Sequence, residues 1–299
     1  MQVHTLDLQF QGQSGLIAAF LIQGDASAVL IETGPETCRE RLLSAIREVG
    51  VSPDSIDGVF VTHVHLDHAG GAGWWARQRV PIFAHPKAVR HLVDPSRLVD
   101  SARLVYGDRF ETLWGGMLPS DETSVRAIAN GEVVDVGGVQ VQAIESLGHA
   151  FHHHAFAVGD SVFAGDAAGA RLFASGYTSV TSAPPQFHLE YTLASIDRIE
   201  QADFSRLFLT HFGEVDSPRD HLLAYREQVE EATAFLKQQM DGKACEESLR
   251  EAYRSFQKAR ADALQLKQEH WRGYELINGT EMCADGIRLF WEKQAGEGA

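Results

Sequence analysis

The first third of the chain alternates between apolar runs and short polar stretches. Residues 16–22 and residues 28–31 are apolar and flank a polar turn, which predicts two neighbouring strands. Over residues 36–50, apolar side chains recur at helical spacing and a glycine follows, so we predict an amphipathic helix. Residues 59–61 are again apolar and predict a short buried strand.

The second half of the chain repeats this organisation. Strand patterns occur over residues 131–136, 139–144, 161–166 and 207–211, and a helical pattern occurs over residues 190–202. The first two runs flank a Gly-Gly turn, which predicts a hairpin. Strands mix with helices in both halves, and the strand pairs of one half weakly echo those of the other. We therefore predict the α/β (α+β) fold class.

Residues 86–127 show neither the helical nor the strand spacing of apolar residues over more than a short stretch. Their apolar side chains are interrupted by glycines and prolines such as Pro95 and Gly107, which predicts short helices and loops. An insertion at this place fits two roles, a lid over a binding site or a layer that covers the sheet.

The composition changes after residue 216. Ser217-Pro218 is a favourable helix start, and apolar residues at helical spacing predict a helix over residues 217–242. A second, highly charged helix is predicted over residues 244–269, so the two form an antiparallel hairpin. Residues 286–291 predict a strand or a helical turn. The apolar stripe of the first helix needs cover, either beside the rim of an active site or from a second subunit in a homodimer.

Charge and cysteine usage narrow the classes of partner. The 299 residues carry a formal net charge of −15, which argues against nucleic acid or an anionic membrane as the main partner. The three cysteines lie far apart and form no disulfide framework, which fits a reducing cytoplasm. The chain shows no signal-peptide pattern and no apolar run long enough to span a membrane. We therefore expect a cytoplasmic protein that acts on a small molecule.

Metal-binding chemistry is concentrated directly after the strand predicted over residues 59–61. There the chain reads Thr62-His63-Val64-His65-Leu66-Asp67-His68-Ala69-Gly70-Gly71. Side chains two apart in an extended segment point the same way, so His63 and His65 can meet one ion. Asp67 and His68 follow where the chain turns toward a helix and can face a second ion. Imidazole and carboxylate ligands suit zinc or iron.

Three more candidate ligands each follow a predicted strand, namely His149, Asp166 and His211. A strand fixed by its packing presents its last side chain at the rim of the sheet, where ligands bind. Together with the H-x-H-x-D-H motif, these residues resemble the metallo-β-lactamase-fold superfamily of metal-dependent hydrolases. The resemblance covers about residues 15–215.

The resemblance implies a fold and a ligand set. Two sheets pack face to face with helices outside, as an αββα sandwich, which we expect as a catalytic domain over residues 1–216. A C-terminal helical extension would follow over residues 217–299. The implied ligands are His63, His65 and His149 for one ion, Asp67, His68 and His211 for the other, and Asp166 as the bridge between them.

The resemblance also implies a mechanism. A carboxylate is suited to bridge because its two oxygens can serve two ions at once. Two divalent ions, Zn or alternatively Fe or Mn, would activate a shared hydroxide for attack on a carbonyl or phosphoryl centre. Asp67 would orient this hydroxide and carry its proton to the leaving group. No Gly-x-Ser-x-Gly elbow points to a serine nucleophile instead.

Several members of the superfamily fit less well than others. Exported β-lactamases are disfavoured, since the best-known group has Cys where this chain has Asp166. Glyoxalase II normally carries three adjacent histidines where this chain has Thr62-His63-Val64-His65. Quorum-quenching lactonases share the H-x-H-x-D-H pattern and the Asp bridge, so we favour a dinuclear hydrolase of an ester, lactone or thioester.

Two alternatives come from other functional classes. One is a mononuclear iron oxidoreductase that resembles persulfide dioxygenases, with iron held by residues matching His63, His65 and either Asp166 or His149. Metal content separates it from a hydrolase. The other is a binding or sensing module without catalysis, which the intact ligand set disfavours.

Further polar residues have open roles. The resemblance implies that Glu32, where the family commonly has Asp, braces the metal loop. His85 ends a predicted strand and is expected to be hydrogen-bonded rather than a ligand. Among His152, His153 and His154, one or two are expected beside the site. The loop after Asp166 should approach the metals, and Tyr177 or His188 either polarises a substrate carbonyl or is structural.

Overall fold

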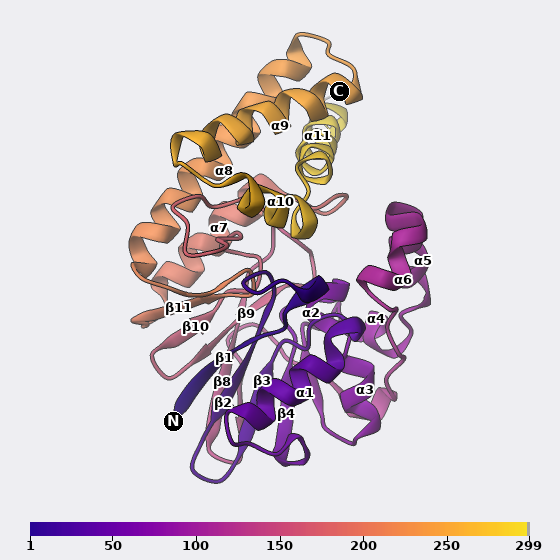
Figure 1. The fold of residues 1–299 in the computed structure, drawn as a ribbon, viewed down its shortest axis with the longest axis vertical. Helices are drawn as coiled ribbons and strands as arrows, with labels where there is room; N and C mark the ends of the chain where they lie inside the picture. Colours follow the sequence, from indigo (N-terminus) through magenta and orange to yellow (C-terminus); the bar gives the residue numbers. More distant parts are fainter. Residues whose placement is uncertain (298–299) are drawn as a thin grey trace.

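Two six-stranded sheets form the centre of the computed structural model, which describes residues 1–297 (Figure 1). The first sheet has the order β1 (Gln2–Asp7), β2 (Ala18–Gln23), β3 (Ala28–Ile31), β4 (Ile56–Phe60), β5 (Ile82–Ala84) and β6 (Val125–Ala127). The second has the order β12 (Gly213–Val215), β11 (Arg206–Leu209), β10 (Ser161–Phe163), β9 (His154–Val158), β8 (Val139–Glu145) and β7 (Val133–Val136).

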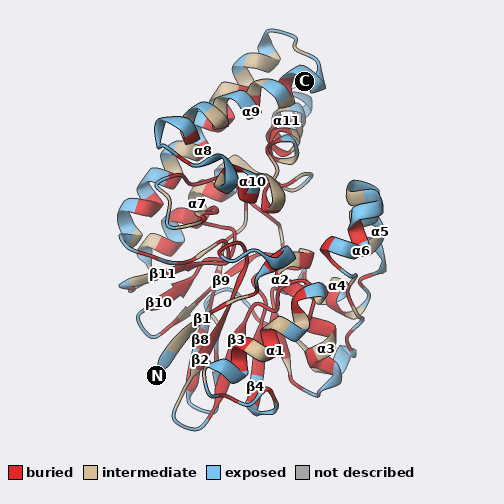
Figure 2. Cartoon of the chain, viewed as in Figure 1, coloured by how far each residue is buried: buried red, intermediate tan, exposed pale blue. Residues whose placement is uncertain are grey.

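Side-chain alternation along the strands explains why the sheets stack. In β2, Phe20 and Ile22 face the core between the two sheets, whereas Ala19 and Leu21 face a core shared with helices. Both sets are buried because successive side chains of a strand point to opposite faces. Figure 2 shows the same division, with buried strands inside and exposed faces on the outer helices. The predicted αββα sandwich is confirmed.

Helices cover the outer face of each sheet. The core of the first sheet includes side chains from α1 (Arg39–Glu48), α2 (Leu66–Ala69) and α3 (Ala72–Arg77). The core of the second sheet includes side chains from α7 (Leu189–Gln201) and α8 (Pro218–Asp241).

The C-terminal helices share this second core. Leu222 and Val229 of α8, Leu249 of α9 (Glu246–Ala263) and Ile287 of α11 (Thr280–Glu297) belong to the same buried cluster as Leu207 of β11. The chain itself therefore covers the apolar stripe of α8. Among residues 1–297, no helix is both long enough and apolar enough to cross a membrane.

For the C-terminal part, one prediction is wrong in detail, and another is decided between its two alternatives. The helix expected over residues 244–269 ends at Ala263, and a separate α10 (Gln268–Ile277) follows. The break lacks Gly and Pro, and instead Gln265 adopts a left-handed φ of 56°, so no local punctuation announced it. Residues 286–291 are not a strand but lie inside α11.

Residues 86–127 form a series of short helices, as predicted. They include α4 (Val89–Val93), α5 (Ser96–Tyr106), the 3-10 turn η4 (Gly107–Arg109) and α6 (Phe110–Leu113). No residue of α5 is buried, whereas α6 buries Phe110 and Leu113. In Figure 1, α5 and α6 lie at one edge of the molecule, across from α10. This segment therefore combines an anchored part with an exposed part.

Candidate metal centre

The candidate ligands all lie just beyond the carboxyl ends of strands. His63 and His65 follow β4, His149 follows β8, and Asp166 and His211 follow β10 and β11. In the second sheet, β8 and β10 are both antiparallel to β9, and β11 is parallel to β10. Strands β8, β10 and β11 therefore run in one direction, and their carboxyl ends meet at the same edge.

The first ligand group consists of three imidazoles. The Nδ1 atom of His65 lies 2.9 Å from Nε2 of His63 and 2.9 Å from Nε2 of His149. His63 is fully buried and His149 is 5% exposed. The predicted trio converges on one point, as a cation with nitrogen ligands requires.

The second ligand group contains Asp67, His68 and His211. The Oδ2 atom of Asp67 lies 3.4 Å from Nε2 of His211 and 3.6 Å from Nε2 of His68. Both imidazoles are buried, and the Asp67 side chain is 15% exposed. This group therefore adds a carboxylate to two histidines.

Asp166 lies between the two groups. Its Oδ2 atom is 3.3 Å from Nε2 of His149, whereas its Oδ1 atom is 3.5 Å from Nε2 of both His68 and His211. Each carboxylate oxygen thus faces a different group. This is the arrangement that a bridging carboxylate needs.

Hydrogen bonds on the outer side of the rings fix their orientation. The Nδ1–H groups of His149 and His211 donate to the carbonyls of Thr181 (2.8 Å) and Leu16 (2.9 Å). A carbonyl can only accept, so Nδ1 carries the proton and Nε2 keeps its lone pair toward the cluster. Such outer partners orient metal-binding imidazoles and raise their basicity.

Glu32 joins three of the segments that build the centre. Its carboxylate accepts hydrogen bonds from the hydroxyl of Thr62 (2.5 Å), from Nδ1–H of His68 (2.9 Å) and from the hydroxyl of Thr210 (3.2 Å). Glu32 is fully buried and adopts a left-handed φ of 67°. A non-glycine residue in this conformation persists only where its surroundings hold it. The expected bracing of the metal loop by Glu32 is confirmed.

Electrostatics separate the two groups. Burial, and then the neighbouring imidazoles, lower the pKa of His63 and His65 well below its usual value, so these two imidazoles favour the neutral form. Burial also opposes a charge on His68, but Asp67, Asp166 and Glu32 outweigh it and raise the pKa of His68 to about 10. The second group therefore favours a positive charge at its centre.

Two buried atoms support a cation at this place. Nε2 of His68 and Oδ1 of Asp166 have no hydrogen-bond partner among the described residues. A buried polar atom without a partner is costly, and both atoms here are metal-ligand types that face one another. The donor set suits zinc, iron or manganese. The residues present therefore fit a metal centre.

Other predicted residues support the centre from outside. His153 is buried, and its Nε2 accepts the backbone N–H of Asp166 at 3.2 Å. His154 is part of β9, and its backbone N–H donates to the carbonyl of Thr62. The ring of His152 lies 5.9 Å from that of His65. His85 is hydrogen-bonded through the N–H of Lys87, as expected for the end of a strand.

Tyr177 and His188 do not reach the ligand groups. The hydroxyl of Tyr177 is buried and donates to Gln257 of α9. His188 stacks on Tyr191, with 4.1 Å between ring centroids. The engaged hydroxyl supports the structural alternative for Tyr177, whereas the role of His188 stays a prediction. The loop after Asp166 turns Tyr177 toward the C-terminal helices. Its contribution to the centre is the carbonyl of Thr181.

Tyr106, at the end of α5, was not singled out by the sequence. Burial and then the charge of Asp67 raise the pKa of its phenol. Its ring packs edge-on against Trp114 at 5.2 Å. No local motif could have revealed these features, since burial and ring packing of Tyr106 arise only in the folded chain.

Comparisons with known proteins agree with this geometry. The "Metallo-beta-lactamase fold-containing protein ST1585" of Sulfurisphaera tokodaii is 28% identical over 173 residues, which are 54% of this chain and 65% of the relative. The "Probable metallo-hydrolase YybB" of Bacillus subtilis is 35% identical over 74 residues, which are 24% of this chain and 31% of the relative. The chain thus spans less than two thirds of these curated relatives.

Solved structures extend the similarity of the fold to the C-terminal helices. The metallo-beta-lactamase family protein TTHA1429 of Thermus thermophilus superposes with a TM-score of 0.69 over 99% of this chain and 94% of its own, at 19% identity. The structure of ST1585 gives a TM-score of 0.61 over 76% of this chain and 85% of its own, at 23% identity. The family model of the "Metallo-beta-lactamase superfamily" matches residues 14–211. The chain therefore belongs to the metallo-β-lactamase superfamily.

Proposed function

We propose that this protein is a dinuclear metal-dependent hydrolase of an ester, lactone or thioester. Membership of the superfamily and the His/Asp clusters support a metal-dependent, hydrolase-like function. The observation that carries the finer proposal is the position of Asp166, whose two oxygens face two separate ligand groups.

The ligands would be the predicted set. His63, His65 and His149 would hold one divalent ion, Asp67, His68 and His211 would hold the other, and Asp166 would join them. When bound, such ions lower the pKa of water toward about 7 and polarise the carbonyl under attack. Zinc is the ion that we propose first, with iron or manganese as alternatives.

The residues of the chain would supply position and proton transfer. Asp67 keeps a partly exposed side chain among buried imidazoles, so its carboxylate can reach both the nucleophilic water and the leaving group. Burial alone would raise the pKa of Asp67, but His68 and His211 lower it below its usual range. Asp67 would therefore remain an acceptor that orients the water and passes a proton on.

We further propose a small-molecule substrate and a cytoplasmic location. The net charge of −15 disfavours nucleic acid and anionic membranes as partners. The name of the Bacillus subtilis relative, a probable metallo-hydrolase, is in line with hydrolysis. A homodimer remains a proposal that size-exclusion chromatography with light scattering can test.

Metal analysis together with a substrate panel tests the function. Metal-replete protein is assayed on aryl esters, lactones and thioesters, and its ions are counted by elemental analysis. We expect two divalent ions per chain and hydrolysis of at least one class. One iron per chain with thiol-dependent oxygen uptake would instead support the persulfide-dioxygenase-like alternative.

A further inference from the structure

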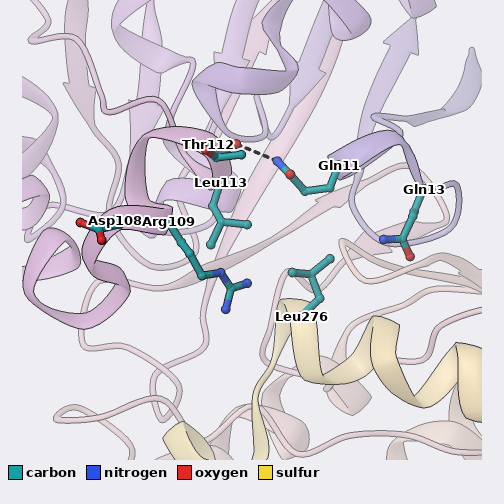
Figure 3. A pocket seen from close by; sticks show the side chains of 7 residues that line it. All are labelled: Gln11, Gln13, Asp108, Arg109, Thr112, Leu113 and Leu276. Atoms are coloured by element: carbon teal, nitrogen blue, oxygen red, sulfur yellow. Dashed lines mark hydrogen bonds between the residues drawn. The ribbon is translucent and has the colours of Figure 1, made fainter.

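A pocket of about 470 Å³ lies where three distant segments meet (Figure 3). Gln11 and Gln13 come from the loop between β1 and β2, Asp108, Arg109, Thr112 and Leu113 from η4 and α6, and Leu276 from α10. The amide of Gln11 donates to the carbonyl of Thr112 at 2.7 Å, and this bond closes one wall.

Arg109 is the charged group that enters this pocket. Figure 3 shows its guanidinium extended between Leu113 and Leu276, while the carboxylate of Asp108 points away. Within residues 1–297, no carboxylate pairs with Arg109 and no hydrogen bond engages its side chain. By contrast, Arg103 of the preceding helix is paired with Glu111. Arg109 therefore presents its donors to the pocket.

The pocket adjoins the metal centre through the loop between β1 and β2. Gln13 of this loop lines the pocket, and the carbonyl of Leu16, three residues on, accepts from Nδ1–H of His211. Burial and the charge of Asp67 raise the pKa of the Tyr106 phenol, and the charge of Arg109 lowers it. Trp114 completes the connection, since its ring stacks on Phe10 at 5.3 Å and touches Tyr106 at 5.2 Å. The loop and these stacked rings thus join the pocket to the second ligand group.

We propose that this pocket binds a carboxylate on the acyl tail of the substrate and that Arg109 recognises it. The proposal rests on the proposed hydrolase function. A guanidinium offers two parallel N–H donors that match one carboxylate. Leu113 and Leu276 offer apolar surface for the methylene groups before it. Within the described part of the chain, Arg109 is the only cationic residue of the lining, so one carboxylate matches its charge better than a doubly charged phosphate monoester. The substrate class is therefore a half-ester or half-thioester of a dicarboxylic acid.

Matched esters test the charge preference. The 4-nitrophenyl monoesters of adipic and suberic acid carry a terminal carboxylate, and the hexanoate and octanoate esters are their neutral counterparts of equal length. We expect Arg109→Gln to lower kcat/KM for the monoesters about 10- to 100-fold relative to the neutral esters, the usual range for a lost charge-assisted hydrogen bond. Arg109→Lys should retain part of the preference.

Arg97→Gln is the matched control, because it removes the same charge from exposed α5 outside the pocket. We expect it to leave the ratio between charged and neutral esters unchanged. The proposal is overturned if Arg109→Gln lowers both ester types equally or leaves the ratio intact.

A binding measurement separates this proposal from the hydrolase proposal. Isothermal titration calorimetry of adipate and of hexanoate on metal-replete protein reports the preference for a second carboxylate without any turnover. We expect wild-type protein to prefer adipate and Arg109→Gln to lose that preference. If no ester is cleaved but this loss occurs, the hydrolase proposal fails and the pocket stands. If wild-type protein shows no preference for adipate, the pocket proposal fails.

Discussion

The metal centre and the Arg109 pocket differ in how deeply their polar side chains are buried. In the centre, Glu32, His63 and His68 are fully buried, and their polar atoms are held from several strand ends. In the pocket, Arg109 and Gln13 are exposed, and the adjoining α5 buries no residue. Rigid strand ends suit groups that must meet within tenths of an ångström, whereas exposed short elements suit groups that select a substrate.

Asp166→Ala removes the carboxylate that lies between the two ligand groups of the metal centre. Three imidazoles would still hold the first ion, but the second group would lose the bridge that fixes the metal spacing. We expect partial retention of metal and a loss of activity of about a thousand-fold or more, since metal-assisted stabilisation contributes several kcal/mol. Elemental analysis and turnover are measured together. Asp160→Ala, a substitution just before β10, is the control. Full metal content together with near-normal turnover in Asp166→Ala would refute the dinuclear mechanism.

Trp114→Ala tests where the rigid region ends. Trp114 is only 3% exposed and packs on Phe10 and Tyr106. We expect a loss of about 3–5 kcal/mol in the free energy of unfolding from the cavity left behind, measured by urea denaturation. Metal content of the folded fraction should not change. If stability is unaffected and only the KM rises, residues 86–127 act purely as a lid.

Glu32→Gln tests the brace behind the second ligand group. The variant keeps the size of the side chain but loses the carboxylate that accepts from Thr62 and His68. Loss of such a supporting partner typically weakens metal binding about 10- to 100-fold. Competition with a chelator measures this affinity, and Glu36→Gln in the following turn is the control. Equal affinities in the two variants would show that Glu32 only supports folding.

The two regions also differ in what the sequence could reveal. His63, His65, Asp67 and His68 could be placed together because strand periodicity and a six-residue motif determine their directions. The Arg109 pocket unites three segments that are far apart in the sequence, and it has no periodic pattern. Strand β9 is also not predicted, and its first residue, His154, is the last of three consecutive histidines that are considered only for their place beside the site. Tertiary contacts, not local preference, determine these features.

His154→Gln tests whether buried histidines around the metal centre make the stability of the fold sensitive to acid. Burial, as the main cause, lowers the pKa of His154 to about 4. Below about pH 6.5, His154 binds a proton in the unfolded chain but stays neutral in the folded chain. The free energy of unfolding therefore falls as the pH drops from about 6.5 to 4. We expect this residue to account for a loss of about 2 kcal/mol between pH 7.5 and 5.

The measurement is urea denaturation of both proteins after chelation, so that metal release does not contribute. His154→Gln should lose less stability on acidification, since glutamine can still donate to the carbonyl of Ile128 but does not titrate. Residues 96–113 contain no histidine, so α5 and α6 contribute nothing of this kind. An unchanged pH slope in the variant would place the acid sensitivity elsewhere.

Tyr106→Phe examines the boundary between the two regions and has the smallest expected effect. Burial and the charge of Asp67 raise the pKa of this phenol, the charge of Arg109 lowers it, and within residues 1–297 no hydrogen bond engages the hydroxyl. We expect it to donate to the bound substrate, so that the variant raises KM several-fold while stability and metal content stay unchanged. Because the phenol is neutral, the loss should be equal for the hexanoate and adipate esters, unlike that of Arg109→Gln. A loss confined to the adipate ester would assign Tyr106 to the carboxylate pocket, and an unchanged KM would exclude contact with the substrate.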